Sequence, residues 1–327
     1  MSTLRIACLQ SAGHGRDVEA NLAELDSAAA AAAAAGAELL VTPEMFVTGY
    51  DVGDVAELAT LPLTERVAAI AAAHGIAVVA GLPAVLPRGG VGNVAVVVDD
   101  SGKVLAGYAK AHLFGEIDRR FHAGEAPAAV FDHHGVRCAV MICFDSEFPE
   151  PVRVAALAGA HVVLVPTANM HPYGAINEHV MWTRAWENKI HLAYVNRCGA
   201  EGTTAYVGRS RIIGPDGTEL AAAGTGPDLV YATIDTDAVD SARAAFDYLS
   251  ERRPALYGTL AVSAEYEEAG GEQEQAPETD AGTGAGAGIC RPLAASDQGS
   301  GRVIPYGSTP GSSRPSPETA VLPPRTG

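Results

Sequence analysis

Short apolar runs alternate with helical stretches over residues 1–263, and this alternation restricts the fold more than any other feature. The runs are rich in Val, Ile and Leu and have the length of single strands, at residues 4–9, 38–42, 77–81, 94–98, 104–108, 136–142, 162–165, 191–195, 209–213 and 229–234. Helical stretches occupy residues 18–35, 64–74, 149–158, 176–188 and 238–249. Turn-forming sequences at 99–102 and 215–217 add hairpins. The pattern therefore predicts an α/β fold with mixed sheets.

The character of the chain changes at residue 264. From there to residue 327 it is rich in Gly, Pro, Ser, Thr and Glu, has few apolar residues, and holds nine acidic and four basic side chains. Such a segment cannot bury enough apolar surface to offset the entropy lost on ordering. We therefore predict one domain over residues 1–263, followed by a disordered low-complexity tail over residues 264–327.

Net charge and cysteine content limit the kinds of binding partner and the cellular compartment that we expect for this protein. The formal net charge of −17 argues against binding to nucleic acid or to an anionic membrane surface. The apolar start of the chain is too short for a signal peptide, and the alanine run at 28–35 is too short for a membrane span. Five cysteines without paired spacing fit a reducing compartment. We expect a cytoplasmic protein.

Three of the predicted strands are followed directly by a residue with an ionisable or nucleophilic side chain. The run 38–43 leads into Glu44, the run 104–109 into Lys110, and the run 136–142 into Cys143. Strand carboxyl ends are where open α/β sheets form ligand sites. Each residue also has an ordinary structural explanation: Glu44 as a helix cap, Lys110 as a solvated strand end, Cys143 as a small core side chain. Their common position at strand ends favours one convergent site.

The residues around these three positions resemble the nitrilase superfamily of carbon–nitrogen hydrolases. The resemblance covers about residues 3–263 and rests on three motifs in the family's order: Thr42-Pro43-Glu44 with Thr48-Gly49-Tyr50, then Tyr108-Ala109-Lys110-Ala111-His112-Leu113-Phe114, then Ile142-Cys143-Phe144-Asp145 with Phe148-Pro149-Glu150. It implies a four-layer α-β-β-α sandwich with two sheets face to face. It also implies assembly as a homodimer or higher homo-oligomer, for which a helix face carrying Trp182 and Trp186 is a candidate surface.

The resemblance implies a role for each of the three residues. Glu44 is the general base, Lys110 the cationic stabiliser and Cys143 the nucleophile, which forms a thioester with the acyl group of the substrate. We expect Lys110 to favour the thiolate, and the Phe144 N–H to help Lys110 hold the oxyanion. This chemistry needs no cofactor and no metal.

A second carboxylate after the lysine is usual in the family, and here its position is ambiguous. The residue seven positions beyond Lys110 is Ile117, which cannot serve, and it is flanked by Glu116 and Asp118. We favour Glu116 because a glutamate has the longer reach. Both acids also have a simpler explanation, as solvated partners of the arginines at 119 and 120.

Further pocket residues follow the apolar run at 162–165. Ala168 and Asn169 are predicted to line the substrate pocket beside Cys143, although the segment also suits a plain turn. The histidines at 133, 134, 171 and 179 have no known metal-ligand spacing, so no metal site is predicted.

The sequence thus predicts a hydrolase that cleaves a small carboxamide and releases ammonia. Phe144-Asp145 after the cysteine resembles the amidase branches, whereas nitrile-hydrolysing members usually have Trp-Glu there. An N-carbamoyl amine hydrolase or a nitrilase is the alternative. A catalytically idle binding module is a third possibility, suggested only by the missing carboxylate at position 117.

Overall fold

The computed structural model describes residues 2–261. These described residues belong to one compact unit. The predicted tail at 264–327 lies outside the described residues, and so does Cys290.

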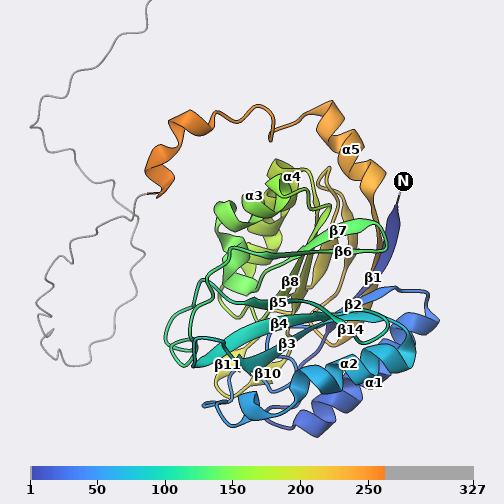
Figure 1. Cartoon of the computed structure of the whole chain (residues 1–327), viewed down its shortest axis with the longest axis vertical. Coiled ribbons are helices and arrows are strands. Elements are labelled where there is room, and N and C mark those ends of the chain that lie inside the picture. The colour runs from blue at the N-terminus through green and yellow to red at the C-terminus, as the bar shows by residue number, and fades with distance from the viewer. Residues whose placement is uncertain (1, 262–327) are drawn as a thin grey trace, which may run out of the picture. The chain divides into compact units, whose positions relative to one another are not determined.

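Two six-stranded sheets form the centre of the domain (Figure 1). The first has the order β14 (Asp228–Asp235), β1 (Thr3–Gln10), β2 (Leu39–Val41), β3 (Ala77–Val85), β4 (Val91–Val98), β5 (Val104–Ala109). The second has the order β13 (Glu219–Ala222), β12 (Arg211–Ile213), β9 (His191–Asn196), β8 (Val162–Thr167), β7 (Val136–Val140), β6 (Ala129–His133). A separate small ribbon pairs β10 (Ala200–Glu201) with β11 (Thr204–Ala205).

Both sheets are mixed, as the sequence predicted. The central strands β1, β2 and β3 pair in parallel, and so do β7, β8 and β9, while the outer strands add antiparallel pairs. The turn at residues 99–102 joins β4 to β5 and the turn at 215–217 joins β12 to β13, each as an antiparallel hairpin. The parallel strands matter most for function, because their carboxyl ends open at one edge of each sheet.

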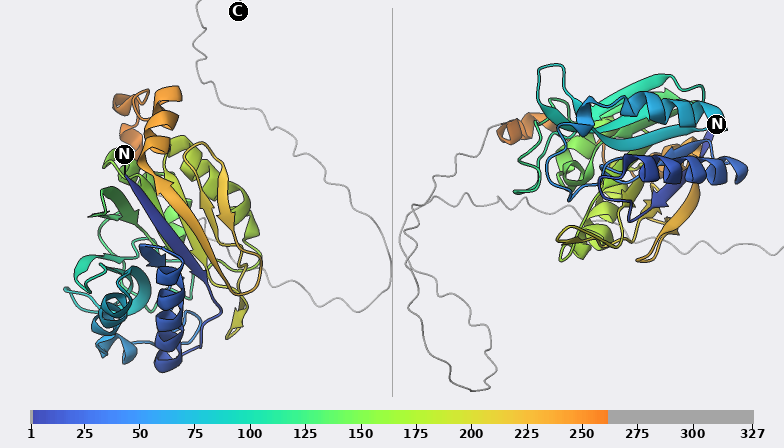
Figure 2. Two further views of the ribbon diagram at one scale, coloured as in Figure 1. Left: turned by 90° about the vertical axis from the view of Figure 1, so that its right-hand side faces the viewer. Right: turned by 90° about the horizontal axis from the view of Figure 1, so that it is seen from below.

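Helices cover the outer face of each sheet. Helices α1 (Val18–Ala34) and α2 (Leu63–His74) lie beside the first sheet, and α3 (Pro149–Leu157) and α4 (Met181–Asn188) beside the second (Figures 1 and 2). Helix α1 begins where the Asp17 carboxylate accepts a hydrogen bond from the Ala20 N–H, and α2 ends at Gly75 in the left-handed conformation. The four layers form the predicted α-β-β-α sandwich.

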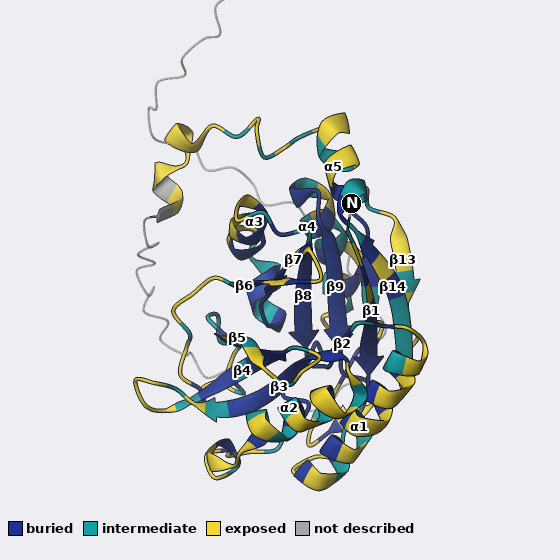
Figure 3. Cartoon of the chain, turned by 45° about the vertical axis from the view of Figure 1, so that its right-hand side comes forward, coloured by how far each residue is buried: buried dark blue, intermediate teal, exposed yellow. Residues whose placement is uncertain are grey.

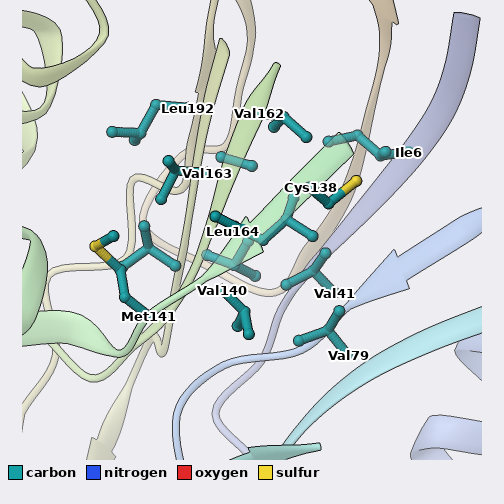
Figure 4. Packing of buried hydrophobic residues seen from close by; sticks show 14 of the residues in the cluster. Ile6, Val41, Val79, Cys138, Val140, Met141, Val162, Val163, Leu164 and Leu192 are labelled. Atoms are coloured by element: carbon teal, nitrogen blue, oxygen red, sulfur yellow. The ribbon is translucent and has the colours of Figure 1, made fainter. Parts of the chain in front are cut away.

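The inner faces of the two sheets enclose the main hydrophobic core. Val41 and Val79 of the first sheet belong to the same cluster as Cys138, Val140 and Leu164 of the second (Figure 4). The central strands are buried along most of their length, whereas the edge strands β13 and β14 and the helices also have exposed positions (Figure 3). The continuous apolar character of the central strands follows from this burial on both faces.

Some elements differ from the sequence prediction. The edge strands β6 and β13 were not predicted, because their mixed exposure gives no continuous apolar run. The stretch predicted as one helix at 176–188 divides into a π-helical turn, η3 (Ile176–Val180), and α4. The last predicted helix, at 238–249, is α5 (Thr236–Ala245), which begins early because the Asp235 carboxylate caps it by accepting from the Asp237 N–H.

No helix within residues 2–261 is long and apolar enough to cross a membrane. The four cysteines in this part of the chain are free thiols, and all are buried. On α4, Trp182 is half-buried and Trp186 is 45% exposed. Assembly through this helix stays a prediction.

Gly81 of β3 holds the backbone that carries Glu44 unusually close to the sheet. The Gly81 N–H donates to the Thr42 hydroxyl at 3.2 Å. A Cβ at position 81 would lie 2.5 Å from both Met45 N and Pro43 O, which are backbone atoms and cannot turn away. Glycine at this position therefore permits the close packing that places Glu44.

Replacing Gly81 with alanine is expected to lower both stability and activity. The added methyl would push the segment around Glu44 away from β3, at a cost of about 1–3 kcal/mol in the free energy of unfolding. Thermal melting and turnover of the variant measure both effects. The matched control is Gly107→Ala in β5, where an added Cβ meets no atom within 4 Å. Equal melting temperatures for the two variants would contradict this account.

Candidate active site

Glu44, Lys110 and Cys143 converge at the ends of three strands from both sheets. Glu44 follows β2, Lys110 follows β5 directly, and Cys143 lies beyond the end of β7. Glu44 and Lys110 have no exposed surface, and Cys143 is 8% exposed. The sequence placed all three at strand ends, and the sandwich brings these ends together.

Lys110 is the centre of a buried charge cluster. Its Nζ donates to Glu44 Oε1 at 2.8 Å and to Asp118 Oδ2 at 2.7 Å. Burial disfavours the ammonium, but interaction with the acidic groups around it, above all Glu44 and also Asp118, outweighs burial and raises the pKa of Lys110 well above its usual value. Lys110 is therefore a fixed cation at any physiological pH.

The second carboxylate at the lysine is Asp118, so the preference for Glu116 was wrong. Glu116 is on the surface, where it pairs with Arg119 and both side chains are about three-quarters exposed, at 77% and 75%. Asp118 is completely buried and accepts from Lys110, from the Phe114 N–H at 2.8 Å and from the Tyr50 hydroxyl at 2.9 Å. The loop folds back onto itself at Phe114, which brings the shorter side chain into reach.

One oxygen of Glu44 is left free. Oε1 accepts from Lys110 and, at 2.6 Å, from the Asn93 amide, whereas Oε2 is buried and has no hydrogen-bond partner within residues 2–261. Burial, offset only in part by the Lys110 charge, raises the pKa of Glu44. A carboxylate with one oxygen held and the other open is suited to accept a proton.

Cys143 stands on a strained turn at the start of η2 (Cys143–Glu147). Its φ is +47°, in the left-handed region that non-glycine residues rarely adopt. Burial and the Glu44 charge raise the pKa of the thiol, and the opposing effects of Lys110, Thr167 and Ala168 are smaller. The Lys110 charge lowers the pKa of the thiol, as expected, but the larger effects leave this pKa raised, so a base is needed to take the proton from Cys143.

Asp145 fixes the turn that carries the nucleophile. Its carboxylate accepts from the Tyr108 hydroxyl at 2.8 Å, from the His112 N–H at 2.8 Å and from the Ile142 N–H at 3.2 Å. Tyr108 and His112 belong to the Lys110 segment. One buried carboxylate therefore ties the cysteine turn to the strand end that carries the lysine.

A pocket of about 180 Å³ opens over Cys143. The predicted pocket residues Phe144, Ala168 and Asn169 all line it. Five further residues line the pocket and were not predicted from the sequence: Tyr50, Phe114, Glu147, Met170 and Tyr173. Tyr50 and Phe114 lie within the motifs that carry the family resemblance, which is the one signal that could have pointed to them.

A larger surface pocket, of about 490 Å³, lies elsewhere and is lined by residues of the β3–β4 turn and of the loop at 122–126. It contains none of the three converging residues and no nucleophile. The smaller pocket is therefore the candidate active site. Its size suits a substrate of few atoms, because pockets for drug-sized ligands usually exceed about 300 Å³.

A buried thiol beside a carboxylate and an ammonium, at the strand ends of an α-β-β-α sandwich, defines a cysteine-dependent hydrolase. Residues 5–244 match the carbon–nitrogen hydrolase family. The chain belongs to this family, the nitrilase superfamily.

Individual relatives agree with this assignment. The chain is 41% identical over 266 residues to a Pseudomonas protegens protein described as "Hydrolase in pqqF 5'region", covering 80% of this chain and 93% of that protein. It is 33% identical to an (R)-stereoselective amidase from a Pseudomonas species, with coverage of 78% and 93%. A solved amidase from Nesterenkonia sp. superposes with a TM-score of 0.71 at 37% identity and covers 79% of this chain and 97% of the amidase.

Proposed function

We propose that this protein hydrolyses the C–N bond of a small carboxamide through a cysteine thioester and releases ammonia. The observation that carries the proposal is the free Oε2 of Glu44, buried in one cluster with the neutral thiol of Cys143 and the ammonium of Lys110. Base, nucleophile and fixed cation are the three groups that acyl transfer from an amide requires.

In the proposed first half of the reaction, Cys143 Sγ attacks the amide carbon while Glu44 Oε2 accepts the thiol proton. An S–C bond forms and the carbonyl oxygen becomes an oxyanion. The Lys110 ammonium and the Phe144 N–H are the proposed donors to it; the Phe144 N–H lies in the first turn of η2, where helical N–H groups lack acceptors within the helix. Each such donor is typically worth about 3 kcal/mol.

Collapse of this intermediate breaks the C–N bond. Glu44 returns the proton to the leaving nitrogen, ammonia departs and a thioester remains on Cys143. Glu44 then deprotonates a water molecule, which attacks the thioester carbon. The S–C bond breaks, the carboxylic acid leaves and Cys143 regains its proton.

The relatives support an amide as the substrate. The Nesterenkonia amidase has been solved in complex with acrylamide and with butyramide. One of its variants carries the acetamide moiety of fluoroacetamide added covalently at the active-site cysteine. These ligands are of the size that the pocket over Cys143 accepts. A relative described as "Nitrilase", from Pyrococcus abyssi, is 34% identical, and its match covers 68% of this chain, compared with 78% for the (R)-stereoselective amidase.

Ammonia release from three matched compounds tests the proposed bond. Butyramide, propylurea and butyronitrile carry the same propyl group and represent an amide, a carbamoyl amine and a nitrile. We expect the highest kcat/KM for butyramide, and its loss after treatment with N-ethylmaleimide. Faster turnover of propylurea or butyronitrile would assign the protein to the alternative class, and no turnover of any of the three would favour an idle binding module.

A further inference from the structure

Glu147 brings a carboxylate into the pocket over Cys143 that the proposed reaction does not use. It is the last residue of η2, one turn beyond the nucleophile, and it lines the same pocket. The side chain is half-buried, so it is removed from bulk water without being sealed in the core.

The Glu147 carboxylate has no hydrogen-bond or ion-pair partner among residues 2–261, although two cations lie near it. Arg184 donates to the backbone carbonyls of Ser146 and Glu147 and pairs with the Glu187 side chain. Lys110 is held by Glu44 and Asp118. Both cations are therefore occupied, and the Glu147 side chain remains available to a ligand.

The charge balance of the site is negative. Glu44 and Asp118 contact the Lys110 ammonium and Glu147 adds a third carboxylate, while the charge of Arg184 is paired with Glu187. An anionic substrate entering this pocket would meet unpaired negative charge in a partly desolvated space, where repulsion is weakly screened. A cationic substrate would restore the balance.

The pocket walls also favour a cation. Phe114 packs edge-on against Phe144 with ring centroids 5.3 Å apart, and against Tyr173 at 5.7 Å. All three rings line the pocket together with Glu147. Aromatic rings beside a carboxylate form the surroundings that bind ammonium groups, because the ring faces carry partial negative charge.

From this geometry we infer that Glu147 is a specificity-determining residue that selects small amides bearing an ammonium group. The inference rests on the proposed amidase function and adds the substrate class. The Glu147 carboxylate accepts a charge-assisted hydrogen bond from the ammonium, the aromatic rings enclose it, and the amide carbon lies at Cys143. Amides with a free carboxylate are disfavoured.

Three amides of equal chain length test this selectivity. They are 4-aminobutanamide, pentanamide and succinamate, which are positive, neutral and negative. 3-Aminopropanamide and 5-aminopentanamide, whose amines stay mainly protonated at pH 8, vary the distance between amide and ammonium. At pH 8 we expect the best aminoamide to exceed its neutral isostere in kcat/KM by about tenfold or more, the usual effect of a charge-assisted hydrogen bond. Succinamate should be the poorest substrate.

Glu147→Gln keeps the shape of the side chain and removes its charge. We expect the ratio of kcat/KM for aminoamide over neutral amide to fall by about tenfold. Glu150→Gln is the matched control, because it removes the same charge from an exposed position in the first turn of α3 and should leave the ratio unchanged. Equal loss of turnover for charged and neutral amides in Glu147→Gln would instead assign Glu147 a role in the chemistry and overturn the inference.

The pH dependence gives an independent readout in the unaltered protein. Burial raises the pKa of Glu147 to about 7, against the lowering effect of Lys110 and Arg184 and together with the raising effect of Glu44. Tyr194 also interacts with Glu147, and its own raised pKa keeps it neutral. The carboxylate is charged above this pH, so the aminoamide preference should appear as pH rises through about 7 and vanish below it. A ratio that stays flat from pH 5 to 9 would contradict the inference.

Binding measurements without turnover test the selectivity for aminoamides independently of the proposed hydrolysis. In Cys143→Ala, calorimetric titration with the same amides measures affinity without turnover. If no amide releases ammonia but the aminoamides still bind best, the proposed reaction fails and the selectivity stands. If amides are hydrolysed but charge makes no difference to rate or affinity, the selectivity fails and the reaction stands.

Discussion

Cys143→Ala is expected to abolish ammonia release while leaving the fold intact. Glu44 and Lys110 then have no nucleophile to activate, and loss of the nucleophile in comparable enzymes costs about 10⁴-fold or more in kcat. The Cys143 side chain is small and borders the pocket, so the substitution opens little space in the core. Turnover of butyramide and the melting temperature of the variant measure the two parts of this expectation.

Cys138→Ala provides the matched control, since it makes the same change in β7 on the same apolar run. Cys138 lies in the core between the sheets and does not line the pocket over Cys143. We expect a lower melting temperature and retained turnover. Residual activity of more than a few per cent in Cys143→Ala would refute the thioester mechanism.

Cys143→Ser tests the base as well as the nucleophile. A hydroxyl is far less acidic than a thiol, so Glu44 cannot deprotonate it effectively even with its raised pKa. We expect turnover close to that of Cys143→Ala. In the unaltered protein, mass spectrometry after rapid mixing with substrate should detect an acyl group on the peptide that contains Cys143.

Asp118→Asn is expected to lower kcat by about 10- to 100-fold, the range found when a hydrogen-bond partner that orients a functional side chain is removed. Asp118 is the acceptor for Lys110, the Phe114 N–H and the Tyr50 hydroxyl together. The amide of asparagine would present a donor to one of these donors. Lys110 would then lose one of its two carboxylate partners and its fixed orientation. Steady-state kinetics with butyramide measure the effect.

Glu116→Gln is the matched comparison, two positions earlier in the same loop. Its exposed pair with Arg119 is of the kind that contributes little, so we expect unchanged kcat and an unchanged melting temperature. Asp118→Glu keeps the carboxylate but lengthens the side chain, so it tests whether a negative charge alone is enough to orient Lys110. If Glu116→Gln were the more damaging variant, Glu116 rather than Asp118 would orient the lysine, and the closed loop conformation would not be the active one.

The positions of Glu44, Lys110 and Cys143 could be predicted because each follows a local sequence pattern. Glu44, Lys110 and Cys143 each end an apolar run, and a strand end is readable from hydrophobic pattern alone. The same pattern gave the α/β class and most strands. It missed β6 and β13 because neither short segment contains a continuous apolar run.

Only the tertiary structure decided which carboxylate meets Lys110. Glu116 and Asp118 are both acidic and lie one position to either side of Ile117, so the sequence offers no spacing argument between them. The longer side chain favoured Glu116, which is not the residue that contacts Lys110. The choice depends on the hydrogen bond from the Phe114 N–H to Asp118, which closes the loop and turns Glu116 outward. A sequence does not specify such a closure by any periodic pattern.

The pKa of the Cys143 thiol and the presence of Glu147 in the pocket likewise depend on tertiary packing. Lys110 lowers the pKa of Cys143, as its proximity suggested, but burial and the Glu44 charge have the larger effect and raise that pKa. Glu147 reads in the sequence as one more acid at a helix start. Its position in the pocket and its lack of a partner exist only once η2, the loop at Phe114 and the segment after β8 have packed together. The sequence by itself determined the strands, their polar ends and the family; long-range packing determined which side chains meet there, because those contacts join residues that share no local pattern.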